Sequence, residues 1–435
     1  MGAGRGSCME RPVRGIRVRA ATWLEALGRI SERRWLLLLA LVVVIPRLLW
    51  IAAMPAIPFT DFAAYDGFAQ RLAAGRGYAT PAGIPTAYWP VGYPLFLAAI
   101  YKLVGHHYLP IKLIQTGLAL MTAICAYLLA RPLSERVGRL AGLLVALWPS
   151  MIGGVDLLAG ENLFVPLFTA SVLMFGSMIG AGGSARPRPW LAGAALGAAT
   201  LVRPLGMGIG ALAFALAMIH RRRRQPGGSI AAVGLACAVA VLVVLPWSLR
   251  NLVVMHSLIP VSANSGVNLW IGNHEGATGA YVEPRALQRL TAGMSEPRAD
   301  KEAARRALLF VKEHPAPALA IIPRKLWHLF ARDTGTVGWM HFDSLAAPRP
   351  RWLKWVFAGA AQAYYAAALL LAAFGLLRGG LKTPTGRWLG LVCLYYVAVH
   401  LIFFGGDRFH LPILPMIAVF SALGLTAWVD RPDHQ

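Results

Sequence analysis

Acidic side chains occur in short segments between long apolar runs, where they could take part in chemistry. Asp61 follows the first apolar run, in PFTDFAAYDG, and Glu161 begins a later run, in GENLF. A carboxylate can act as a general base that takes a proton from a hydroxyl group. Asp61 and Glu161 are therefore the candidate catalytic residues.

Arginines in similar segments could bind an anion. Arg203 lies in TLVRP, Arg250 in PWSLRN and Arg408 in GDRFHLP. A guanidinium group forms strong, paired hydrogen bonds with phosphate or carboxylate. The candidate substrate-binding residues are Tyr93, Arg203, Arg250, Asp407, Arg408 and His410. No metal site is expected, because pairs such as His106–His107 supply too few ligands.

Several of these residues also have a purely structural interpretation. Asp61 could cap a helix in contact with solvent, and Asp156 could be an N-cap. Glu161 would be favoured at a helix N-terminus whatever its function. Arg47 lies inside the first apolar run, where a structural role is favoured over contact with a substrate.

The composition predicts an all-α polytopic membrane protein. Hydrophobic residues make up 57% of the 435 residues, and charged residues only 14%, against about 25% in soluble chains. Many apolar runs reach the roughly 20 residues that a membrane-spanning helix needs. The net charge is +23, but the charges form short clusters between apolar runs. That placement indicates membrane topology and argues against nucleic-acid binding.

The distribution of Lys and Arg orients the chain, because short cytoplasmic segments are enriched in both. The arginine-rich segment before residue 35 predicts a cytoplasmic N-terminus. The apolar stretch 93–105 is too short to cross, so we expect a helix at the outer interface. About ten spans are predicted, with both termini inside: 35–54, 109–130, 139–155, 160–181, two short helices in 189–220 that turn near Arg203–Pro204, 229–247, 353–376, 388–404 and 410–429.

This topology divides the chain into four parts. They are a basic cytoplasmic tail (1–34), an N-terminal transmembrane catalytic module (35–247) with an outer loop at 55–109, a second outer region (248–352), and C-terminal spans with a short cytoplasmic tail (353–435). In the second outer region, 262–284 is rich in Gly and Asn and predicts turns. The stretches 297–314 and 315–333 predict helices, the latter amphipathic and interfacial. All candidate site residues map to the outer side.

The motifs together resemble a known family. The acid after the first span is followed by PTAYWPVGYPLFLAAIYKLVG, GENLF, TLVRP, PWSLRN, NLWIGNHEGATG and GDRFHLPILP. This order resembles the membrane glycosyltransferases of family 39 and their bacterial relatives. These include the protein O-mannosyltransferases and the transferases that add aminoarabinose or galacturonic acid to lipid A. The resemblance extends from about residue 40 to 425.

The resemblance implies a GT-C helical bundle with an outer cavity, and a sugar donor linked to polyprenyl phosphate. The family's catalytic first-loop acid falls on Asp61, and its second-loop acid on Glu161. The protein mannosyltransferases have Asp-Glu where this chain has Asp61-Phe62, and a basic residue before two prolines where this chain has Trp89-Pro90-Val91. The phosphate-binding position therefore does not carry over, and Arg203, Arg250 and Arg408 are the candidates instead.

The expected function is inverting transfer of a sugar to an acceptor hydroxyl on a lipid, a glycan or a protein. No cofactor is expected, and no nucleotide-binding motif is present. The expected location is a bacterial inner membrane, with the site facing the periplasm or cell exterior. A transporter or flippase for a lipid-linked or anionic solute remains an alternative, as does a glycan polymerase or ligase on a similar scaffold. The sequence leaves the sugar and the acceptor open.

Overall fold

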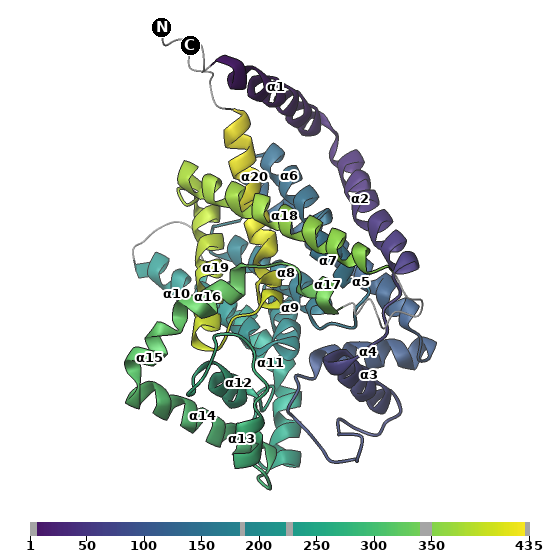
Figure 1. The fold of residues 1–435 in the computed structure, drawn as a ribbon, viewed down its shortest axis with the longest axis vertical. Helices are drawn as coiled ribbons and strands as arrows, with labels where there is room; N and C mark the ends of the chain where they lie inside the picture. Colours follow the sequence, from purple (N-terminus) through teal and green to yellow (C-terminus); the bar gives the residue numbers. More distant parts are fainter. Residues whose placement is uncertain (1–6, 183–187, 223–228, 340–349, 431–435) are drawn as a thin grey trace.

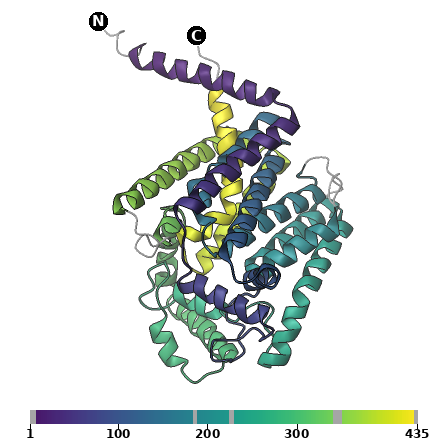
Figure 2. The ribbon, with the colours of Figure 1, turned by 90° about the vertical axis from the view of Figure 1, so that its right-hand side faces the viewer.

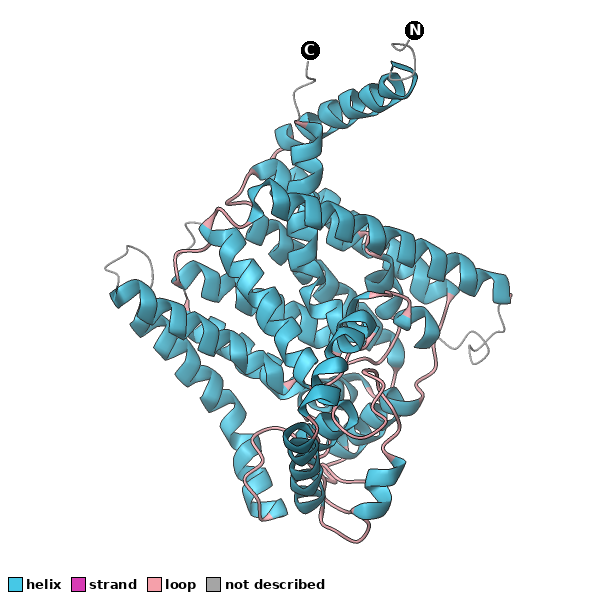
Figure 3. Ribbon diagram, turned by 60° about the vertical axis from the view of Figure 1, so that its left-hand side comes forward, coloured by secondary structure: helices cyan, strands magenta, loops and turns pink. Residues whose placement is uncertain are grey.

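A computed structural model describes residues 7–182, 188–222, 229–339 and 350–430. Every regular element in these ranges is helical (Figure 3). Within them, eight helices are long and apolar enough to cross a membrane, and this is an integral membrane protein. They are α2 (Glu32–Ala53), α5 (Tyr108–Ala130), α8 (Glu161–Met178), η1 with α10 (Pro204–Arg222), α11 (Ile230–Met255), α18 with η2 (Arg351–Gly380), α19 (Pro384–Ile402) and η3 with α20 (Asp407–Val429).

The predicted span 139–155 is broken into two shorter helices. Helix α6 covers Glu135–Ala146 and helix α7 covers Pro149–Gly154. Pro149 stands in the first turn of α7, where its missing N–H costs nothing, but its ring cannot continue the preceding helix. Arg47 supports the break, because its guanidinium donates to the carbonyl of Ala146 at 2.9 Å. The structural role predicted for Arg47 is the one the structure shows.

The predicted hairpin in 189–220 has the expected form. Helix α9 (Pro189–Val202) ends at Arg203, a 3-10 turn η1 (Pro204–Met207) follows, and α10 (Gly208–Arg222) returns. Helix α9 packs tightly on α11 through Gly197, where an added Cβ would lie 2.8 Å from the carbonyl oxygen of Ala240. The helix of 14 residues is shorter than the other spans. The predicted turn at Arg203–Pro204 is confirmed.

The first outer loop contains two helices. Helix α3 covers Thr60–Ala73 and helix α4 covers Gly92–Val104. The 13 residues of α4 span about 20 Å, which is shorter than the hydrocarbon layer. Between the helices the chain turns at Gly75 and Gly77, which adopt the positive φ angles of 72° and 70° that glycine tolerates.

The second outer region is more helical than its composition suggests. Besides α13 (Arg285–Leu290), α14 (Glu296–Glu313), α15 (Pro315–Ala320), α16 (Ile322–Phe330) and α17 (Gly335–Trp339), it contains α12 (Ser265–Gly272). The prediction of turns over 262–284 is therefore wrong at α12. Asp300, from α14, stabilises the start of α12 by accepting hydrogen bonds from Gly266 N–H at 2.7 Å and Val267 N–H at 3.1 Å. The single helix predicted over 315–333 is divided into α15 and α16, and α16 buries Lys325 and Leu329 while Trp327 is exposed.

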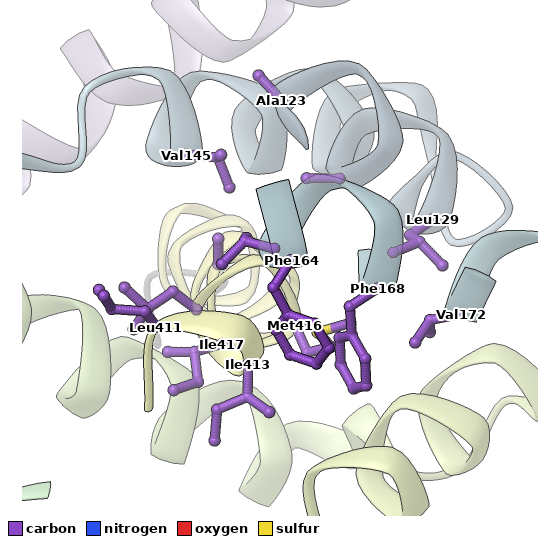
Figure 4. Packing of buried hydrophobic residues seen from close by; sticks show 14 of the residues in the cluster. Ala123, Leu129, Val145, Phe164, Phe168, Val172, Leu411, Ile413, Met416 and Ile417 are labelled. Carbon is purple, nitrogen blue, oxygen red and sulfur yellow. The ribbon is translucent and has the colours of Figure 1, made fainter. Parts of the chain in front are cut away.

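The arrangement separates the two ends of the molecule. Helix α1 (Ser7–Arg29) and the end of α20 (Leu414–Val429) lie at one end, and α3, α4 and α12–α14 lie at the other (Figures 1 and 2). The first and last described helices of the chain therefore lie at the same end of the molecule. A hydrophobic core from α5, α6, α8 and η3–α20 fills the centre, with Phe164, Phe168 and Met416 fully buried (Figure 4).

Candidate functional site

Four charged side chains form a continuous array where α3, α8, α9 and η3 meet. An Arg408 Nη atom lies 3.2 Å from a carboxylate oxygen of Asp61. Arg408 Nε lies 3.4 Å from Oε1 of Glu161. Arg203 donates to the same Glu161 oxygen. The charges therefore alternate in the order Asp61, Arg408, Glu161, Arg203. We call these four residues the charged array.

The ends of helices bring these side chains together. Asp61 lies in the first turn of α3, and Glu161 is the first residue of α8. The positive ends of the two helix dipoles favour carboxylates at these positions. Arg203 is the C-cap of α9, in an extended conformation imposed by the following Pro204. Both acids and both arginines come from segments that the sequence analysis had selected, although far apart in the chain.

The four side chains differ in their access to solvent. The side chain of Asp61 is 32% exposed and that of Glu161 only 9%. One Asp61 oxygen faces Arg408, and the other has no polar partner among the described residues. Glu161 lies between two guanidinium groups. Asp61 is therefore the carboxylate that an incoming hydroxyl group could reach, whereas Glu161 holds the arginines.

Aromatic rings fix the planes of both guanidinium groups. The Arg408 guanidinium lies 5.3 Å from the ring centre of Trp339 and 5.4 Å from that of Phe409. The Arg203 guanidinium lies 5.7 Å from the ring centre of Phe409 and 6.0 Å from that of Phe164. Such cation–π contacts attract the cation to the ring face. Phe409 thus lies between the two arginines and keeps their spacing.

Tyr65 belongs to the same neighbourhood, and the sequence analysis missed it. It stands four residues after Asp61 on α3, and this spacing places both on one face of a helix. Burial raises the pKa of Tyr65 to about 12, against the opposing effect of Arg408. Its phenol therefore stays protonated and can donate a hydrogen bond. The ring packs against Trp89 and Tyr93, with centroids 5.7 and 5.6 Å away.

A cavity borders the charged array. Glu161 and Trp339 form part of its wall, and the space between its walls is about 530 Å³, including the part open to solvent. The lining combines apolar side chains with uncharged polar ones. Its remaining residues are Gln115, Ala119, Thr122, Ser150, Met151, Gly154, Leu157, Ala159, Asn162, Val165, Pro166, Thr336 and Leu411.

Three further predicted site residues lie behind the array. Tyr93 is 1% exposed, and its hydroxyl donates to Gln115 at 2.6 Å. Asp407 lies against Gly335, where an added Cβ would meet its carboxylate. His410 is fully buried. The Asp407 carboxylate accepts hydrogen bonds from the backbone N–H groups of Arg408 and Gly335. All three side chains support neighbouring segments in this structure.

Arg250 is not brought to the array. Its guanidinium donates to the backbone carbonyls of Thr86 and Tyr78, both at 2.8 Å, and lies 4.8 Å from the ring of Trp247. Glu296 binds the same turn from the opposite side, accepting from Thr86 Oγ at 2.9 Å. Together these contacts hold the turn between α3 and α4. Arg250 therefore lies apart from Arg203 and Arg408 in this structure, and both of its Nη atoms donate to backbone carbonyls.

Two other acids in the outer segments are engaged in internal contacts. Asp156 is 2% exposed, lies 2.5 Å from Lys112 Nζ and accepts from the backbone N–H of Ala56. Burial raises the pKa of Asp156 to about 6. It therefore ties the start of the first outer loop to α5, and does not cap its own helix. In the described part of the chain, no three His, Cys, Asp or Glu side chains gather closely enough to hold a metal ion.

The other acid is Asp66, on α3. Tyr101 and Tyr108 donate their hydroxyls to its carboxylate, the latter at 3.2 Å. Gln70 donates at 2.9 Å, and a ring nitrogen of His106 lies 3.0 Å away. Four side chains therefore satisfy one carboxylate. They join α3 to α4 and to the start of α5.

Comparison with known proteins agrees with the resemblance. Residues 89–248 match the sequence model of the family described as dolichyl-phosphate-mannose-protein mannosyltransferase. No curated protein matches the chain significantly. The family resemblance inferred from the sequence is thus confirmed over this segment, which contains Glu161 and Arg203.

Solved structures show the fold. The apo oligosaccharyltransferase of Archaeoglobus fulgidus matches with a TM-score of 0.55 and 15% identity, over 92% of this chain and 50% of that one. The same archaeal enzyme, AglB, in complex with an inhibitory peptide and a dolichol-phosphate, matches with a TM-score of 0.52 and 15% identity, over 91% and 50%. ArnT from Cupriavidus metallidurans, bound to undecaprenyl phosphate, gives a TM-score of 0.43 and 14% identity, over 92% and 78%. This chain spans about half the length of the archaeal chains. The predicted GT-C helical fold is confirmed.

Proposed function

We propose that this protein transfers a sugar from a polyprenyl-phosphate-linked donor to an acceptor hydroxyl on a lipid, a glycan or a protein. The reaction takes place at the charged array. We place the array on the non-cytoplasmic face of a bacterial inner membrane, because the basic N-terminal segment belongs to the opposite end of the molecule.

One observation carries the proposal: the partly exposed carboxylate of Asp61 contacts one guanidinium group, Arg408, which Glu161 links to a second, Arg203. Asp61 has one oxygen without a polar partner among the described residues, and Arg408 contacts the other at 3.2 Å. A base with a free lone pair and adjacent cations suits a reaction that removes a proton from a hydroxyl and releases a phosphate. A cavity adjoins the array, with Glu161 in its wall.

The proposed reaction is a single displacement. The acceptor oxygen attacks the anomeric carbon while its proton passes to Asp61. As the new C–O bond forms, the bond from the anomeric carbon to the phosphate oxygen breaks, and its electron pair leaves with the polyprenyl phosphate. Attack and departure take place on opposite faces, so the configuration inverts. One base is sufficient for such a displacement, and the array offers one accessible carboxylate.

Arg203 and Arg408 are the proposed phosphate ligands. Negative charge grows on the leaving phosphate as the bond breaks, and fixed guanidinium groups stabilise that charge without having to reorganise. Glu161 keeps the two cations close together before the donor binds, because both contact its Oε1 atom. Tyr65 is a further donor beside them, with its phenol protonated at neutral pH.

The comparisons support the donor class. The matching family is described by a dolichyl-phosphate-linked sugar donor. The archaeal AglB structure with the same fold holds a dolichol-phosphate and an inhibitory peptide. We propose a polyprenyl-phosphate donor for this chain on these grounds together with the arginines of the array.

Reconstitution tests the proposal. The purified protein is placed in vesicles with polyprenyl-phosphate-linked sugars carrying a radiolabel, together with a membrane lipid extract as acceptor. We expect labelled sugar in a new glycoside and free polyprenyl phosphate in equal amount, identified by mass spectrometry. Movement of intact donor across the vesicle membrane, with no new glycoside, would show a flippase instead and would refute the transferase.

A further inference from the structure

We propose that His410 and Asp333 form a buried positioning pair that sets the place of Arg408 in the donor phosphate site. The inference rests on the proposed function, because it concerns an arginine of the charged array. His410 was predicted as a substrate-binding residue, and Asp333 was not selected at all. The contacts of both residues instead indicate that they position Arg408.

His410 is held from both sides of its ring. One nitrogen, Nδ1, lies 2.7 Å from the backbone carbonyl oxygen of Leu329, and Nε2 lies 3.2 Å from an oxygen of Asp333. The ring stacks on Tyr365 with centroids 4.9 Å apart. Both ring nitrogens therefore face oxygen atoms, and these contacts fix the orientation of the ring. His410 is 0% exposed, so no substrate reaches it.

Asp333 connects this histidine to the rest of the site. It is 2% exposed, and its second oxygen accepts from Trp148 Nε1 and Ser150 Oγ, both at 2.8 Å. Gln362, from α18, accepts from the Asp333 backbone N–H at 3.1 Å. One buried carboxylate therefore joins the start of α7, the segment after α16, and η3. Breaking such a fully bonded buried group is costly.

The pair is placed to control Arg408. His410 follows Arg408 by two residues in η3, a short 3-10 helix, whose hydrogen-bond geometry is poorer than that of an α-helix. The carboxylate of the adjacent Asp407 lies against Gly335, two residues after Asp333, where it occupies the space that a Cβ would need. The segments 333–335 and 407–410 thus interlock. A shift of η3 would move the Arg408 guanidinium away from Asp61 and Glu161.

A double-mutant cycle separates positioning from general destabilisation. Binding of undecaprenyl phosphate is measured by isothermal titration calorimetry for the purified wild type, Arg408→Ala, His410→Ala and the double variant. We expect each single variant to weaken binding about tenfold and the double variant to be no weaker than Arg408→Ala, because His410 acts through Arg408. Ser421→Ala is the matched control and should bind as the wild type does, because Ser421 is a buried, hydrogen-bonded side chain in α20, the helix that follows η3.

If His410→Ala does not fold, the conservative variant His410→Gln takes its place in the double-mutant cycle. Asp333→Asn should retain most binding, because its amide oxygen still accepts from Trp148 and Ser150 while its amide donates to a neutral His410. Losses that multiply in the double variant, or wild-type binding by a folded His410 variant, would overturn the positioning role. A wild type that forms no glycoside would instead refute the proposed function.

Discussion

Two acids on the same helix have opposite surroundings. Asp61 and Asp66 lie five residues apart on α3, in the first outer loop. The Asp61 side chain is 32% exposed and meets a single cation, Arg408. The Asp66 side chain is 10% exposed and is satisfied by four side chains from α3, α4, the following turn and the start of α5. A carboxylate that is available for chemistry is therefore recognised by an oxygen without a hydrogen-bond partner. The segment in which the residue lies does not distinguish it.

The contrast between Asp61 and Asp66 predicts that substitutions affect activity at one site and stability at the other. Changes at the charged array should remove activity and leave a folded protein, because its outermost group is partly solvated and incompletely bonded. Changes at the Asp66 cluster should lower stability and leave the activity of each folded molecule. The predictions below test this separation, from the largest expected effect to the smallest.

Asp61→Asn should lower kcat for sugar transfer by about 10² to 10⁴-fold, the usual contribution of a general base. The amide keeps the shape of the side chain but cannot take the proton. The midpoint of thermal unfolding should change little. The rate is measured with labelled donor in proteoliposomes at matched protein levels. Near-normal transfer by this variant would remove Asp61 from the mechanism.

Arg203→Met should lower transfer by roughly 100-fold, as for loss of one fixed donor to a developing negative charge. Glu161 keeps Arg408 as a partner, so the protein should still fold. The measurement is kcat/KM over a series of donor concentrations. Arg203→Lys is the matched variant and should recover part of the loss. Unchanged donor kinetics in both variants would place the phosphate elsewhere.

Asp66→Ala should lower the free energy of unfolding by roughly 3 kcal/mol, because buried donors of Tyr101 and Tyr108 lose their acceptor. Transfer per folded molecule should stay within about twofold of the wild type. Chemical denaturation and an active-site-normalised rate give the two values. A large fall in kcat with unchanged stability would break the comparison between the two acids.

Lys325 offers a pH-dependent check on the segment before Arg408. Its ammonium group is 1% exposed and donates to Asn273 and to the carbonyl of Leu401, both at 3.0 Å. Burial lowers the pKa of Lys325 to about 8. The folded state therefore releases its proton at lower pH than the unfolded state does, and the wild type should gain stability as pH rises past 8.

Between pH 7 and 9.5 this gain should be about 2 kcal/mol relative to Lys325→Met, which does not titrate there. Unfolding of both proteins is followed at each pH, so that other titrating groups cancel in the difference. If the free energy of unfolding changed with pH in the same way for both proteins, the burial of Lys325 would not lower its pKa as described.

Arg250→Lys should have the smallest effect. A lysine cannot donate to the carbonyls of Thr86 and Tyr78 with the same paired geometry. We expect a loss of about 1 kcal/mol in stability and an unchanged KM for the donor. A clear rise in donor KM, with stability retained, would return Arg250 to the phosphate site and correct the placement described above.

The helices were predictable because membrane spans are encoded in long apolar runs. The hairpin turn at Arg203–Pro204 and the short helix 92–104 were predictable from proline and from length. The break before Pro149 was missed, since the surrounding residues are as apolar as those of a span. The helix α12 was missed because Asp300, its N-terminal partner, lies 35 residues beyond its first residue, Ser265.

The site was predictable only in part. Asp61, Glu161, Arg203 and Arg408 could be selected because ionised groups near membrane spans are costly and need partners. Their alternating order comes from packing of four distant segments, which no local pattern reports. Asp333 looked like one more acid in a long loop, and its contacts with His410 and Trp148 exist only in the folded protein. Tyr65 had a local signal, its spacing of four from Asp61.

The stereochemistry of transfer tests the central claim most directly. Donor of known anomeric configuration is converted by the reconstituted protein, and the configuration of the new glycoside is read by NMR from the coupling between H1 and H2 of the sugar. A single displacement with Asp61 as the base predicts complete inversion. A product with retained configuration would require a covalent sugar–enzyme intermediate, and would contradict the mechanism built on the charged array.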